Sequence, residues 1–475
     1  MSDLTCFMSP KSVAVIGVSK RSGFSWGRGM LHNLVGAGFE GKIYLVNPTG
    51  DEIEGLKVYP DLDRIPGQVD LAVITVPVRL VKKAIQDCIQ KKVKNAMVVT
   101  AGYAETSEGK ALQEELTDMA KAAGMRIVGP NVNGIFNLSS KLDVSMVNHA
   151  YISDTPIAII SQGGYALNDL IYRGHKRRMG VGKYFPTGNE CDVTCTEVLE
   201  YFGMDPGIKV IILYIESVRD GTKFLKAAKK AAKDKVVLAV TGGSTIDGAK
   251  AAQSHTGAMG GSSQVLKAAL KQANIVECPE MELLLHMAHA FHELPPLKGS
   301  RIGVVTMGGS WGVMATDALN KKGLAVPELS LSLQHKLHDL GMPYWASARN
   351  PVDLGAAGSA MWAGGGGVAA VEQLVLSDEV DAVVVHGFGQ TGYAFVGYDP
   401  AVRSASAQVE EEMMRQMLGL IPKYEKPILI CSYFDETDSE TIAKITGQGE
   451  RVYHNVKDAA AILSCMQTYY YRLAH

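Results

Sequence analysis

The stretch "AAQSHTGAMGG" at residues 251–261 places a histidine among unusually small neighbours. His255 stands between two hydroxyl residues, Ser254 and Thr256, and Gly257 follows at once. An imidazole nitrogen is a good nucleophile at neutral pH because it need not first lose a proton. Small neighbours leave room for a second reactant to approach the ring. The stretch therefore suits a transient phosphohistidine, with a solvated histidine in a surface loop as the alternative.

A phosphorylated imidazole needs a carboxylate to orient the ring and backbone N–H groups to bind the phosphoryl oxygens. Buried strands predicted from apolar runs supply both. "KVIILYI" ends at Glu216, "PIAII" leads into Ser161-Gln162-Gly163-Gly164, and "KVVLAV" leads into Thr241-Gly242-Gly243. Ligands of parallel sheets bind outside the carboxyl ends of the strands. We therefore expect Glu216 and His255 to share one sheet edge with a glycine-rich helix start. A surface ion pair is the alternative role for Glu216.

Three segments of the chain open in the same way. A short β-branched run ends in a glycine turn before a helix-compatible stretch in "SVAVIGVS" (12–19), "PIAIISQGG" (156–164) and "RIGVVTMGGSWG" (301–312). This pattern is typical of a buried parallel strand that begins a βαβ unit. Helices follow, such as "GTKFLKAAKKAAKDK", with apolar residues on one face and lysines on the other. The pattern predicts an α/β fold of three doubly wound parallel-sheet domains, one Rossmann-like and two flavodoxin-like.

The expected domains span residues 1–140, 150–292 and 300–475. The second boundary falls in "ELPPLKGS" (293–300), which has the Pro, Gly and Ser content of a linker. The first boundary is softer and lies near 135–155, where the periodicity is lost. A chain of 475 residues is long enough for this number of domains.

The first glycine turn, from Gly17 to Gly27, offers backbone amides and a helix start to a phosphate group. Its spacing is not G-x-G-x-x-G. The next strand ends at Asn47-Pro48, where an NAD site has an acid for the ribose hydroxyls, so an NAD-dependent oxidoreductase is disfavoured. Lys20 and Arg21 beside the turn suit a ligand rich in phosphate, such as coenzyme A. The alternative is a turn that only packs a helix on a strand.

The composition and net charge of the chain limit the classes of molecule that it is expected to bind. A formal net charge of -2 gives no support for nucleic acid, which usually needs a strongly basic face. The sequence has no signal-peptide start and no apolar run near the ~18 residues of a membrane span, so we expect a cytoplasmic protein. The 7 cysteines are scattered, and Cys191 and Cys195 are the closest pair. We expect reduced thiols and no bound metal.

Several motifs together resemble the NDP-forming (ADP-forming) acyl-CoA synthetases, which are relatives of the succinyl-CoA synthetase alpha subunit. "SHTGAMGG" is similar to their phosphohistidine segment, and "LYIESVRDGTKF" is similar to the segment with their catalytic glutamate. "GNECDVTCTEVLEYFGMDP" (188–206), "NPVDL" (350–354) and the N-terminal "SVAVIG…NP…AVITVP…GPN" resemble further family segments. The resemblance covers nearly the whole chain. It implies a CoA-binding first domain, a second domain that carries the phosphohistidine, and a third α/β domain.

By this resemblance His255 carries the phosphoryl group and Glu216 steadies it, while a carboxylic acid and coenzyme A are the substrates. The family also needs an ATP-grasp module, so the resemblance implies a hetero-oligomer with an ATP-grasp beta subunit that brings ATP/ADP and Mg²⁺. The residues expected to bind coenzyme A are Gly17, Ser19, Lys20, Arg21, Asn47, Pro48, Val76, Pro77, Ala101 and Asn131. Those expected to bind phosphate are Ser161, Gly163, Gly164, Ser254, Thr256 and Gly257.

The chain departs from the family pattern at five positions. Gly163 stands in place of the usual serine, Thr241 in place of lysine, and Ser244 in place of arginine. Met307 and Trp311 stand where the family has Asn and Pro. The loss of two basic residues near a phosphoryl site favours a second hypothesis, a non-catalytic CoA-binding regulatory subunit of the same fold. The intact histidine and glutamate favour the ligase.

Overall fold

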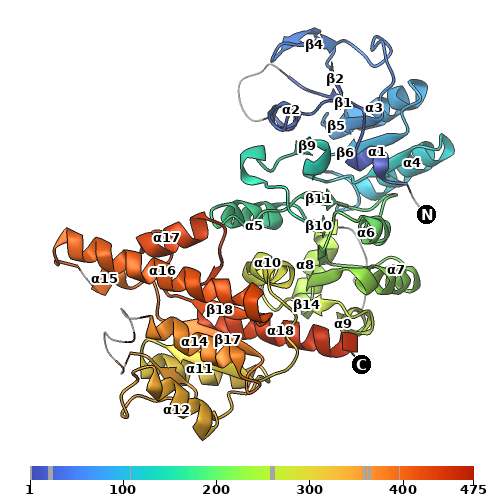
Figure 1. Cartoon of the computed structure of the whole chain (residues 1–475). Helices are drawn as coiled ribbons and strands as arrows, with labels where there is room; N and C mark the ends of the chain where they lie inside the picture. The colour runs from blue at the N-terminus through green and yellow to red at the C-terminus, as the bar shows by residue number, and fades with distance from the viewer. Residues whose placement is uncertain are drawn as a thin grey trace. The chain divides into compact units, whose positions relative to one another are not determined.

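The computed structural model describes residues 3–19, 25–106, 108–256, 263–355, 357, 361, 365–394 and 396–474 (Figure 1). Within them the chain forms three mostly parallel β-sheets with helices between the strands, which confirms the predicted α/β class. The chain divides into two compact units, one of residues 1–175 with 180–284 and the other of 176–179 with 285–475. The first unit contains two of the sheets and the second contains the third.

The first sheet has the strand order β3-β4-β2-β1-β5-β6-β7 and is parallel except for β3. Its strands are β1 (Ser12–Ile16), β2 (Lys42–Val46), β3 (Asp51–Ile53), β4 (Leu56–Tyr59), β5 (Leu71–Ile74), β6 (Asn95–Val98) and β7 (Arg126–Val128). Its helices are α1 (Thr5–Met8), α2 (Trp26–Gly36), α3 (Val78–Gln90) and α4 (Gly109–Ala122). Side chains of β1 alternate between two cores: Val13 and Val15 lie in the core that includes α2, whereas Ala14 and Ile16 lie in the one that includes α3 and α4. Helices therefore cover both faces, as in a doubly wound sheet.

The second sheet has the order β14-β13-β12-β10-β11-β8-β9, with β8 and β9 antiparallel. Its strands are β8 (Gly134–Asn137), β9 (Leu142–Ser145), β10 (Ile157–Ser161), β11 (Lys183–Pro186), β12 (Val210–Ile215), β13 (Val236–Thr241) and β14 (Val276–Glu277). Its helices are α5 (Tyr165–His175), α6 (Cys195–Met204), α7 (Gly221–Asp234), α8 (Ile246–Thr256) and α9 (Ser263–Gln272), with short 3₁₀ turns η1 (Leu138–Ser140), η2 (His149–Tyr151) and η3 (Met281–Leu283). The predicted amphipathic helix is α7, in which Phe224, Ala228 and Ala232 are buried.

Strands β8 and β9 form a hairpin where the sequence loses its periodicity. Asp143 is fully buried, and its Oδ1 accepts hydrogen bonds from the Ser145 N–H (2.9 Å) and hydroxyl (2.6 Å). Burial raises the pKa of Asp143 to about 7. Because these polar residues interrupt the apolar pattern, the sequence does not predict the hairpin. Apolar residues of β9 and α2 lie in one core, so the first two sheets share that core.

The third sheet has the order β16-β15-β17-β18-β19 and is parallel throughout, which is the 2-1-3-4-5 order of flavodoxin-like folds. Its strands are β15 (Ile302–Thr306), β16 (Val352–Asp353), β17 (Ala382–His386), β18 (Ile428–Cys431) and β19 (Val452–Tyr453). The helices of this unit are α10 (Leu284–Glu293), α11 (Gly309–Lys321), α12 (Leu331–Asp339), α14 (Gly366–Leu376), α15 (Thr391–Ala394), α16 (Pro400–Tyr424), α17 (Glu440–Gly447) and α18 (Val456–Ala474).

The segment Lys176–Met179 belongs to the second unit although it follows α5 of the first. Arg177 forms an ion pair with Glu436, with 2.9 Å between Nε and Oε1. Arg451 donates to the carbonyl oxygens of Arg177 (2.8 Å) and Arg178 (3.3 Å). The chain therefore passes between the units three times, after residues 175, 179 and 284.

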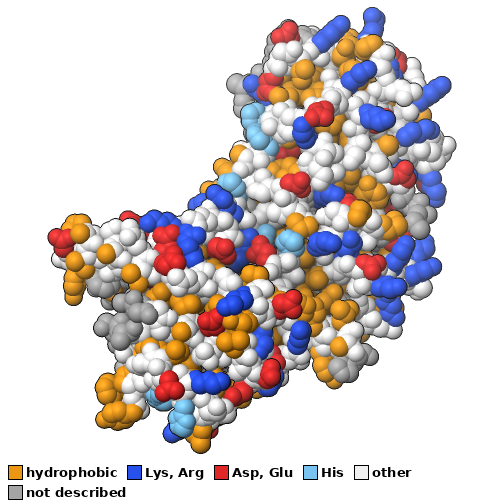
Figure 2. Space-filling view, in the orientation of Figure 1, with side chains coloured by type: hydrophobic (Ala, Val, Ile, Leu, Met, Phe, Trp, Pro, Cys, Tyr) orange, Lys and Arg blue, Asp and Glu red, His pale blue; other side chains and the backbone are white. Residues whose placement is uncertain are grey.

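Charged side chains of both signs are distributed over the face seen in Figure 2, with lysines gathered over α7. The exposed positions of α7 include Lys226, Lys229, Lys230 and Lys233, opposite its buried alanines. This is the ordinary solvated face of an amphipathic helix. In the part of the chain that the structure describes, no helix has the length and apolar character needed to cross a membrane.

Candidate functional site

Three neighbouring strands of the second sheet end side by side. In the parallel register Ser161 of β10 pairs with Tyr214 of β12, and Ile215 of β12 pairs with Thr241 of β13. The residues just beyond these strand ends, Gln162 and Glu216, therefore meet at one edge. The glycine-rich turn before α5 leaves the same edge, because α5 begins at Tyr165.

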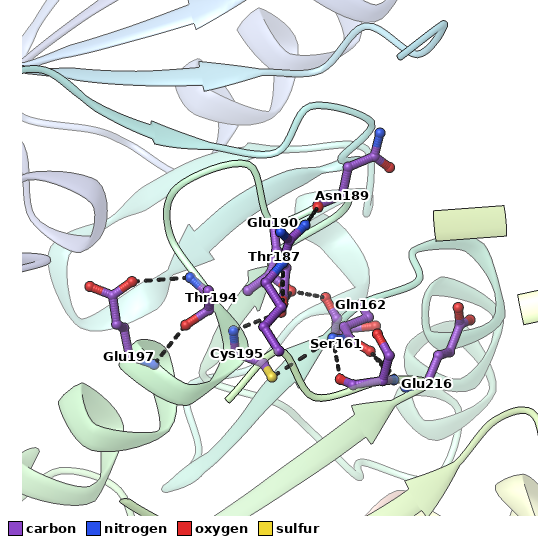
Figure 3. A network of polar contacts seen from close by, with 11 residues as sticks. Ser161, Gln162, Thr187, Asn189, Glu190, Thr194, Cys195, Glu197 and Glu216 are labelled. Carbon is purple, nitrogen blue, oxygen red and sulfur yellow. Dashed lines mark hydrogen bonds and ion pairs between the residues drawn. The ribbon is translucent and has the colours of Figure 1, made fainter. Parts of the chain in front are cut away.

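Gln162 connects two of these strand ends (Figure 3). Its side chain is 3% exposed, and its Oε1 accepts hydrogen bonds from the backbone N–H groups of Glu216 (2.6 Å) and Ser217 (3.0 Å). Its Nε2 donates to the Ser217 carbonyl oxygen at 2.9 Å. These bonds fix the backbone that carries Glu216 relative to the turn before α5.

The Glu216 carboxylate has a tyrosine partner on its own strand. The Tyr214 hydroxyl donates to Glu216 Oε1 at 2.8 Å. Burial, and then the neighbouring Glu216, raise the pKa of Tyr214 well above its usual range, so the hydroxyl keeps its proton and remains a donor. Gly242 lies against this pair, because a β-carbon there would stand 3.0 Å from Glu216 Cγ and 3.1 Å from the Tyr214 hydroxyl. Carboxylate, phenol and glycine backbone are therefore closely packed.

A cavity of about 150 Å³ opens beside Glu216. Its lining comes from the ends of β12 and β13 and from α7, α8 and α9, and it includes Thr241 and Ala252. The apolar part of the lining is larger than the polar part. The catalytic edge proposed from the sequence thus adjoins this cavity.

His255 lies in the last turn of α8. Its side chain, those of Ser254 and Thr256, and the whole of Gly257 lie outside the described residues. The backbone at position 255 is the end of a helix, where the alternative interpretation from the sequence has a surface loop. Ala252, three residues earlier in α8, lines the cavity, so the described part of this helix reaches the same edge.

The three remaining phosphate candidates lie at the end of β10 (Ser161) and in the turn before α5 (Gly163 and Gly164). The Gly163 N–H donates to Ser161 Oγ at 3.1 Å, and that hydroxyl also bonds the Gly163 carbonyl oxygen. A β-carbon at Gly164 would lie 2.7 Å from the Asn133 side chain, so only glycine fits there without a shift. Asn133 accepts from the Tyr184 hydroxyl at 2.8 Å. Asn133 therefore packs against this turn, and the N-terminus of an 11-residue helix follows the turn.

The motif at 188–206 connects neighbouring elements through hydrogen bonds (Figure 3). Glu190 is 4% exposed, and its Oε1 accepts from the Thr187 hydroxyl (2.9 Å) and from the Cys195 N–H at the start of α6 (2.7 Å). Asn189 donates to Gln113 of α4 at 3.0 Å. The motif therefore ties the second sheet to a helix of the first. Burial raises the pKa of the Cys195 thiol, so this cysteine stays protonated.

The residues expected to bind coenzyme A follow the carboxyl ends of strands in the first sheet, where doubly wound folds bind ligands. Gly17 follows β1, Asn47 follows β2, Val76 follows β5, and Asn131 follows β7. A β-carbon at Gly17 would stand 2.9 Å from Val76 Cγ1, and the φ of Gly17 is +103°, so glycine lets these two turns touch. Each described member of the predicted set is at least partly exposed: Gly17, Ser19, Asn47, Pro48, Val76, Pro77, Ala101 and Asn131.

Asn47 holds two turns together. Its Nδ2 donates to the Val18 carbonyl oxygen at 2.6 Å, and its Oδ1 accepts from the Thr49 N–H (3.0 Å) and hydroxyl (2.8 Å). Because the amide is engaged at both ends, it does not offer the paired acceptors that a ribose needs in an NAD site. Lys20 and Arg21 lie outside the described residues.

Two family models match the chain, a "succinyl-CoA ligase like flavodoxin domain" over residues 154–291 and a "CoA binding domain" over residues 11–137. The alpha subunit of an ADP-forming acetate–CoA ligase II of Pyrococcus furiosus is 36% identical over 355 residues, which cover 74% of this chain and 76% of the relative. The alpha subunit of ligase I of that organism is 37% identical over 360 residues, with the same shares covered.

This chain belongs to the family of ADP-forming acid–CoA ligases. A solved relative agrees over the whole length: an acetyl-coenzyme A synthetase 1 of Ca. Korarchaeum cryptofilum, in complex with phosphate and ADP, matches with a TM-score of 0.85 and 29% identity. The match covers 100% of this chain and 98% of that one. The resemblance drawn from the motifs is therefore confirmed.

Two of the positions at which this ligase chain departs from its family pattern, Thr241 and Trp311, contact other side chains. The Thr241 hydroxyl donates to Glu277 Oε1 at 3.0 Å. Trp311, in the first turn of α11, packs against His386 with ring centroids 4.2 Å apart and the rings inclined at 36°. Burial lowers the pKa of His386 to about 4, so this histidine is neutral.

Sequence reasoning missed two residues that build the edge, Gln162 and Tyr214. Gln162 lies inside the quoted segment Ser161–Gly164, but nothing in the spacing shows that its side chain turns toward β12. Tyr214 precedes Glu216 by two residues, and the period of two in a strand places both on one face. That periodicity could have identified Tyr214 as the partner of the carboxylate.

Within the described ranges, no group of three or more His, Cys, Asp or Glu side chains is arranged to hold a metal ion. The 7 cysteines are free thiols, as the sequence predicts.

Proposed function

We propose that this chain is the alpha subunit of an ADP-forming acid–CoA ligase and that His255 carries the phosphoryl group between substrates. The observation that supports this most is the meeting of Glu216, the Gly242 turn and α8 at one sheet edge. The Glu216 carboxylate accepts from Tyr214, and its backbone N–H is bonded to Gln162, so the carboxylate is positioned to accept a hydrogen bond from one imidazole nitrogen. The other nitrogen is then the nucleophile.

The reaction follows in three steps. An imidazole nitrogen of His255 attacks the γ-phosphorus of ATP, and ADP leaves with the electrons of the broken P–O bond. A carboxylate oxygen of the acid then attacks the phosphohistidine, which gives an acyl phosphate and restores the imidazole. The CoA thiol loses its proton and attacks the acyl carbon, so that acyl-CoA and phosphate are released. Positioning and charge stabilisation carry most of such phosphoryl transfers.

Each step has candidate residues on this chain. The turn Ser161–Gly164 and the N-terminus of α5 would hold the phosphoryl oxygens through backbone N–H groups and the helix dipole. The strand ends at Gly17, Asn47, Val76 and Asn131 would hold coenzyme A, whose thiol supplies the final nucleophile. Their partial exposure and the close contact of the Gly17 and Val76 turns fit an elongated ligand along this edge.

The chain would work with a second subunit. By the family resemblance, the Mg²⁺–nucleotide is assigned to an ATP-grasp beta subunit, and the assembly is a hetero-oligomer. The names of the two Pyrococcus furiosus relatives support this, since both are alpha subunits. We also propose that the protein is cytoplasmic. We further propose that its domains span residues 1–140, 150–292 and 300–475.

The second candidate is a non-catalytic CoA-binding regulatory subunit. One observation favours it: Thr241, in place of a family lysine, is bonded to Glu277 and brings no positive charge to the edge. The two candidates differ in whether His255 is ever phosphorylated.

The test uses the reverse half-reaction, which needs only the groups assigned to this chain. With a panel of acyl-CoAs and labelled phosphate, the chain should acquire label that is lost in acid and kept in base, since a phosphoramidate hydrolyses in acid. Adding ADP, Mg²⁺ and the beta subunit should release the label as ATP. His255→Asn should fold, as judged by its melting curve, and stay unlabelled.

Glu216→Gln tests the role of the carboxylate at the strand-end edge, because the variant keeps the shape of the side chain and its contact with Tyr214 but removes the negative charge. We expect its labelling rate to fall by roughly 10²–10⁴-fold, as for other acid–base partners. Label mapped to Ser254 or Thr256, or full turnover by His255→Asn in the complex, would show that the phosphohistidine assignment is wrong. CoA binding without label from any acyl-CoA, together with a complex that turns over no acid, would support the regulatory subunit.

A further inference from the structure

We propose that Trp26 and Tyr165 are positioning residues that hold the thiol-bearing arm of coenzyme A between the edge of the first sheet and the turn before α5. The inference rests on the proposed function, in which these two places bind coenzyme A and the phosphoryl group. It adds two residues to the last step of that reaction.

The rings of Trp26 and Tyr165 join the starts of two helices. Trp26 is the first residue of α2, and Tyr165 is the first residue of α5. Their ring centroids lie 6.5 Å apart and the ring planes are inclined at 85°, which is the edge-to-face arrangement that aromatic pairs prefer. Helix α5 follows the glycine turn of the second sheet, whereas α2 belongs to the first sheet. The pair therefore spans the two sheets of the first unit.

The start of α2 lies against the edge assigned to coenzyme A. A β-carbon at Gly27, the residue after Trp26, would stand 3.2 Å from Val18 Cα and 2.7 Å from the Thr75 hydroxyl oxygen. Val18 belongs to the turn after β1, and Thr75 follows β5. Trp26 is therefore next to two of the strand ends at which coenzyme A is expected.

Helix α2 is fixed to the second sheet by buried contacts. Asn33 is 5% exposed, and its Nδ2 donates to the carbonyl oxygens of Ser145 and Val147, both at 2.9 Å. A β-carbon at Gly29 would stand 3.0 Å from Met146 Cε, so the helix packs directly on the end of β9. These contacts set the position of α2 independently of the aromatic pair.

Helix α5 is attached to the same hairpin through Asn133. Asn133 is 4% exposed, its Nδ2 donates to Asn168 Oδ1 of α5 at 2.8 Å, and its carbonyl oxygen accepts from the Met146 N–H at 2.9 Å. The separation of the two helix starts is therefore set by buried polar contacts. Tyr165, in contrast, is 62% exposed, and a ring left mostly in water stabilises the fold little. Beside a reaction edge, such a ring is available to a ligand.

The chemistry of the arm matches these two rings. The arm is an uncharged chain with amide and methyl groups, and it ends in the thiol. Its apolar segments gain dispersion contacts from aromatic faces, and no cation is needed to hold them. In the last step the sulfur–carbon bond forms, the bond from the acyl carbon to the phosphate oxygen breaks with its electron pair on phosphate, and the thiol proton passes to water. The thiol reaches the acyl carbon only if the arm crosses from the first sheet to the turn before α5, which is the path that Trp26 and Tyr165 span.

The first experiment compares two routes to the labelled chain. Labelling by acyl-CoA and labelled phosphate needs the arm, and in Trp26→Leu and Tyr165→Leu it should be slower by roughly 10²-fold, the cost of a misplacement of about 1 Å. Labelling by ATP in the complex with the beta subunit does not need the arm and should keep the wild-type rate. Tyr165→Phe keeps the ring and should restore the rate of the first route.

Tyr172→Leu is the matched control. Tyr172 is an exposed aromatic residue farther along α5, and it forms another edge-to-face pair, with 4.8 Å between its ring centroid and that of Tyr151. This variant should keep both labelling rates, and melting curves show whether each variant is folded. Equal losses on the two routes in folded Trp26→Leu and Tyr165→Leu, or wild-type rates on both routes, would overturn the inference. Label on the wild-type chain would leave the proposed function standing in either case.

Calorimetry on this chain separates the inference from the activity. Wild type should bind coenzyme A more tightly than the adenosine bisphosphate end of coenzyme A alone, since only the whole molecule has the arm. Trp26→Leu and Tyr165→Leu should bind coenzyme A about tenfold more weakly, near the upper end of what one aromatic contact contributes, and should bind the adenosine bisphosphate as wild type does. If neither route labels the chain but this pattern holds, the proposed function fails and the assignment of the two rings stands. No binding of coenzyme A, equal affinities of wild type for both ligands, or equal losses for both ligands would overturn it.

Discussion

Replacing Gln162 by methionine should separate the positioning of Glu216 from general stability. The side chain keeps its length but loses four hydrogen bonds, to the N–H groups of Glu216 and Ser217, to the Ser217 carbonyl oxygen and, at 3.8 Å, to the Cys195 sulfur. The Glu216 amide lies beside the cavity and can bond water instead. Ser217 is 8% exposed, so its N–H and C=O are left without partners.

The cost can be worked out from those two groups. A buried polar group without a partner costs about 1–3 kcal/mol, so the variant should lose about 2–6 kcal/mol of unfolding free energy. The effect on chemistry has a different origin. A shift of about 1 Å in a catalytic group costs roughly 10²-fold in rate, and the Gln162 bonds are what fix the Glu216 backbone.

The assay is labelling of the chain by acyl-CoA and labelled phosphate, at a temperature where the melting curve shows the variant folded. We expect the labelling rate of Gln162→Met to be roughly 10²-fold below wild type. Asn95→Leu is the matched control, because Asn95 is also a buried amide bonded to a backbone carbonyl, that of Asp70, but at the amino end of its strand. It should lose stability and keep its labelling rate. Equal rate losses in both variants, or a wild-type rate in folded Gln162→Met, would refute the positioning role.

Three further predictions concern other parts of the chain. Gly242→Ala should slow labelling by at least about tenfold, because the added carbon would stand 3.0 Å from Glu216 Cγ. Gly419→Ala is the control, since a β-carbon there would meet nothing within 4 Å, and it should keep the wild-type labelling rate. Equal labelling rates in the two variants would contradict the packing argument. Asp143→Asn should remove a pH dependence of stability: the pKa of Asp143 is raised from 3.8 to about 7, so its contribution is fully present below pH 4 and is lost as the pH rises to 7. Denaturation of both proteins from pH 4 to 8 checks this, and the reasoning fails if the wild type does not lose about 2–4 kcal/mol relative to the variant. Calorimetry should show tighter binding of coenzyme A than of NAD, because Asn47 is engaged at both ends; comparable affinities would contradict this.

The sequence predicts the parts of the fold that depend on local pattern. Each of the three β-branched runs that end in glycine is a central strand, β1, β10 or β15, followed by a helix. The amphipathic pattern of residues 221–235 predicts α7. These predictions succeed because a strand buried on both faces must be apolar throughout, and a surface helix must be apolar on one side.

The parts that the sequence does not predict depend on contacts made across the fold. In the β8–β9 hairpin, Asp143 and Ser145 interrupt the apolar strand pattern, and their polar groups are hydrogen-bonded to each other. The helix that ends at Thr256 is obscured because Gly248, Ser254 and Thr256 have low intrinsic helix propensity. Gln162 acts on a strand that is distant in sequence, and only the parallel register brings the two together. Local spacing does not contain that information.

Residues Lys176–Met179 belong to the second unit, and this affects how the protein can be divided into fragments. A fragment that ends before residue 285 would lose the contacts of residues 176–179 with Arg451 and Glu436. A fragment that starts at 285 would lose the two carbonyl oxygens to which Arg451 donates. No single cut yields both units with their native contacts. Truncation, limited proteolysis or exchange of a unit with a relative must therefore treat residues 176–179 and 285–475 as one module.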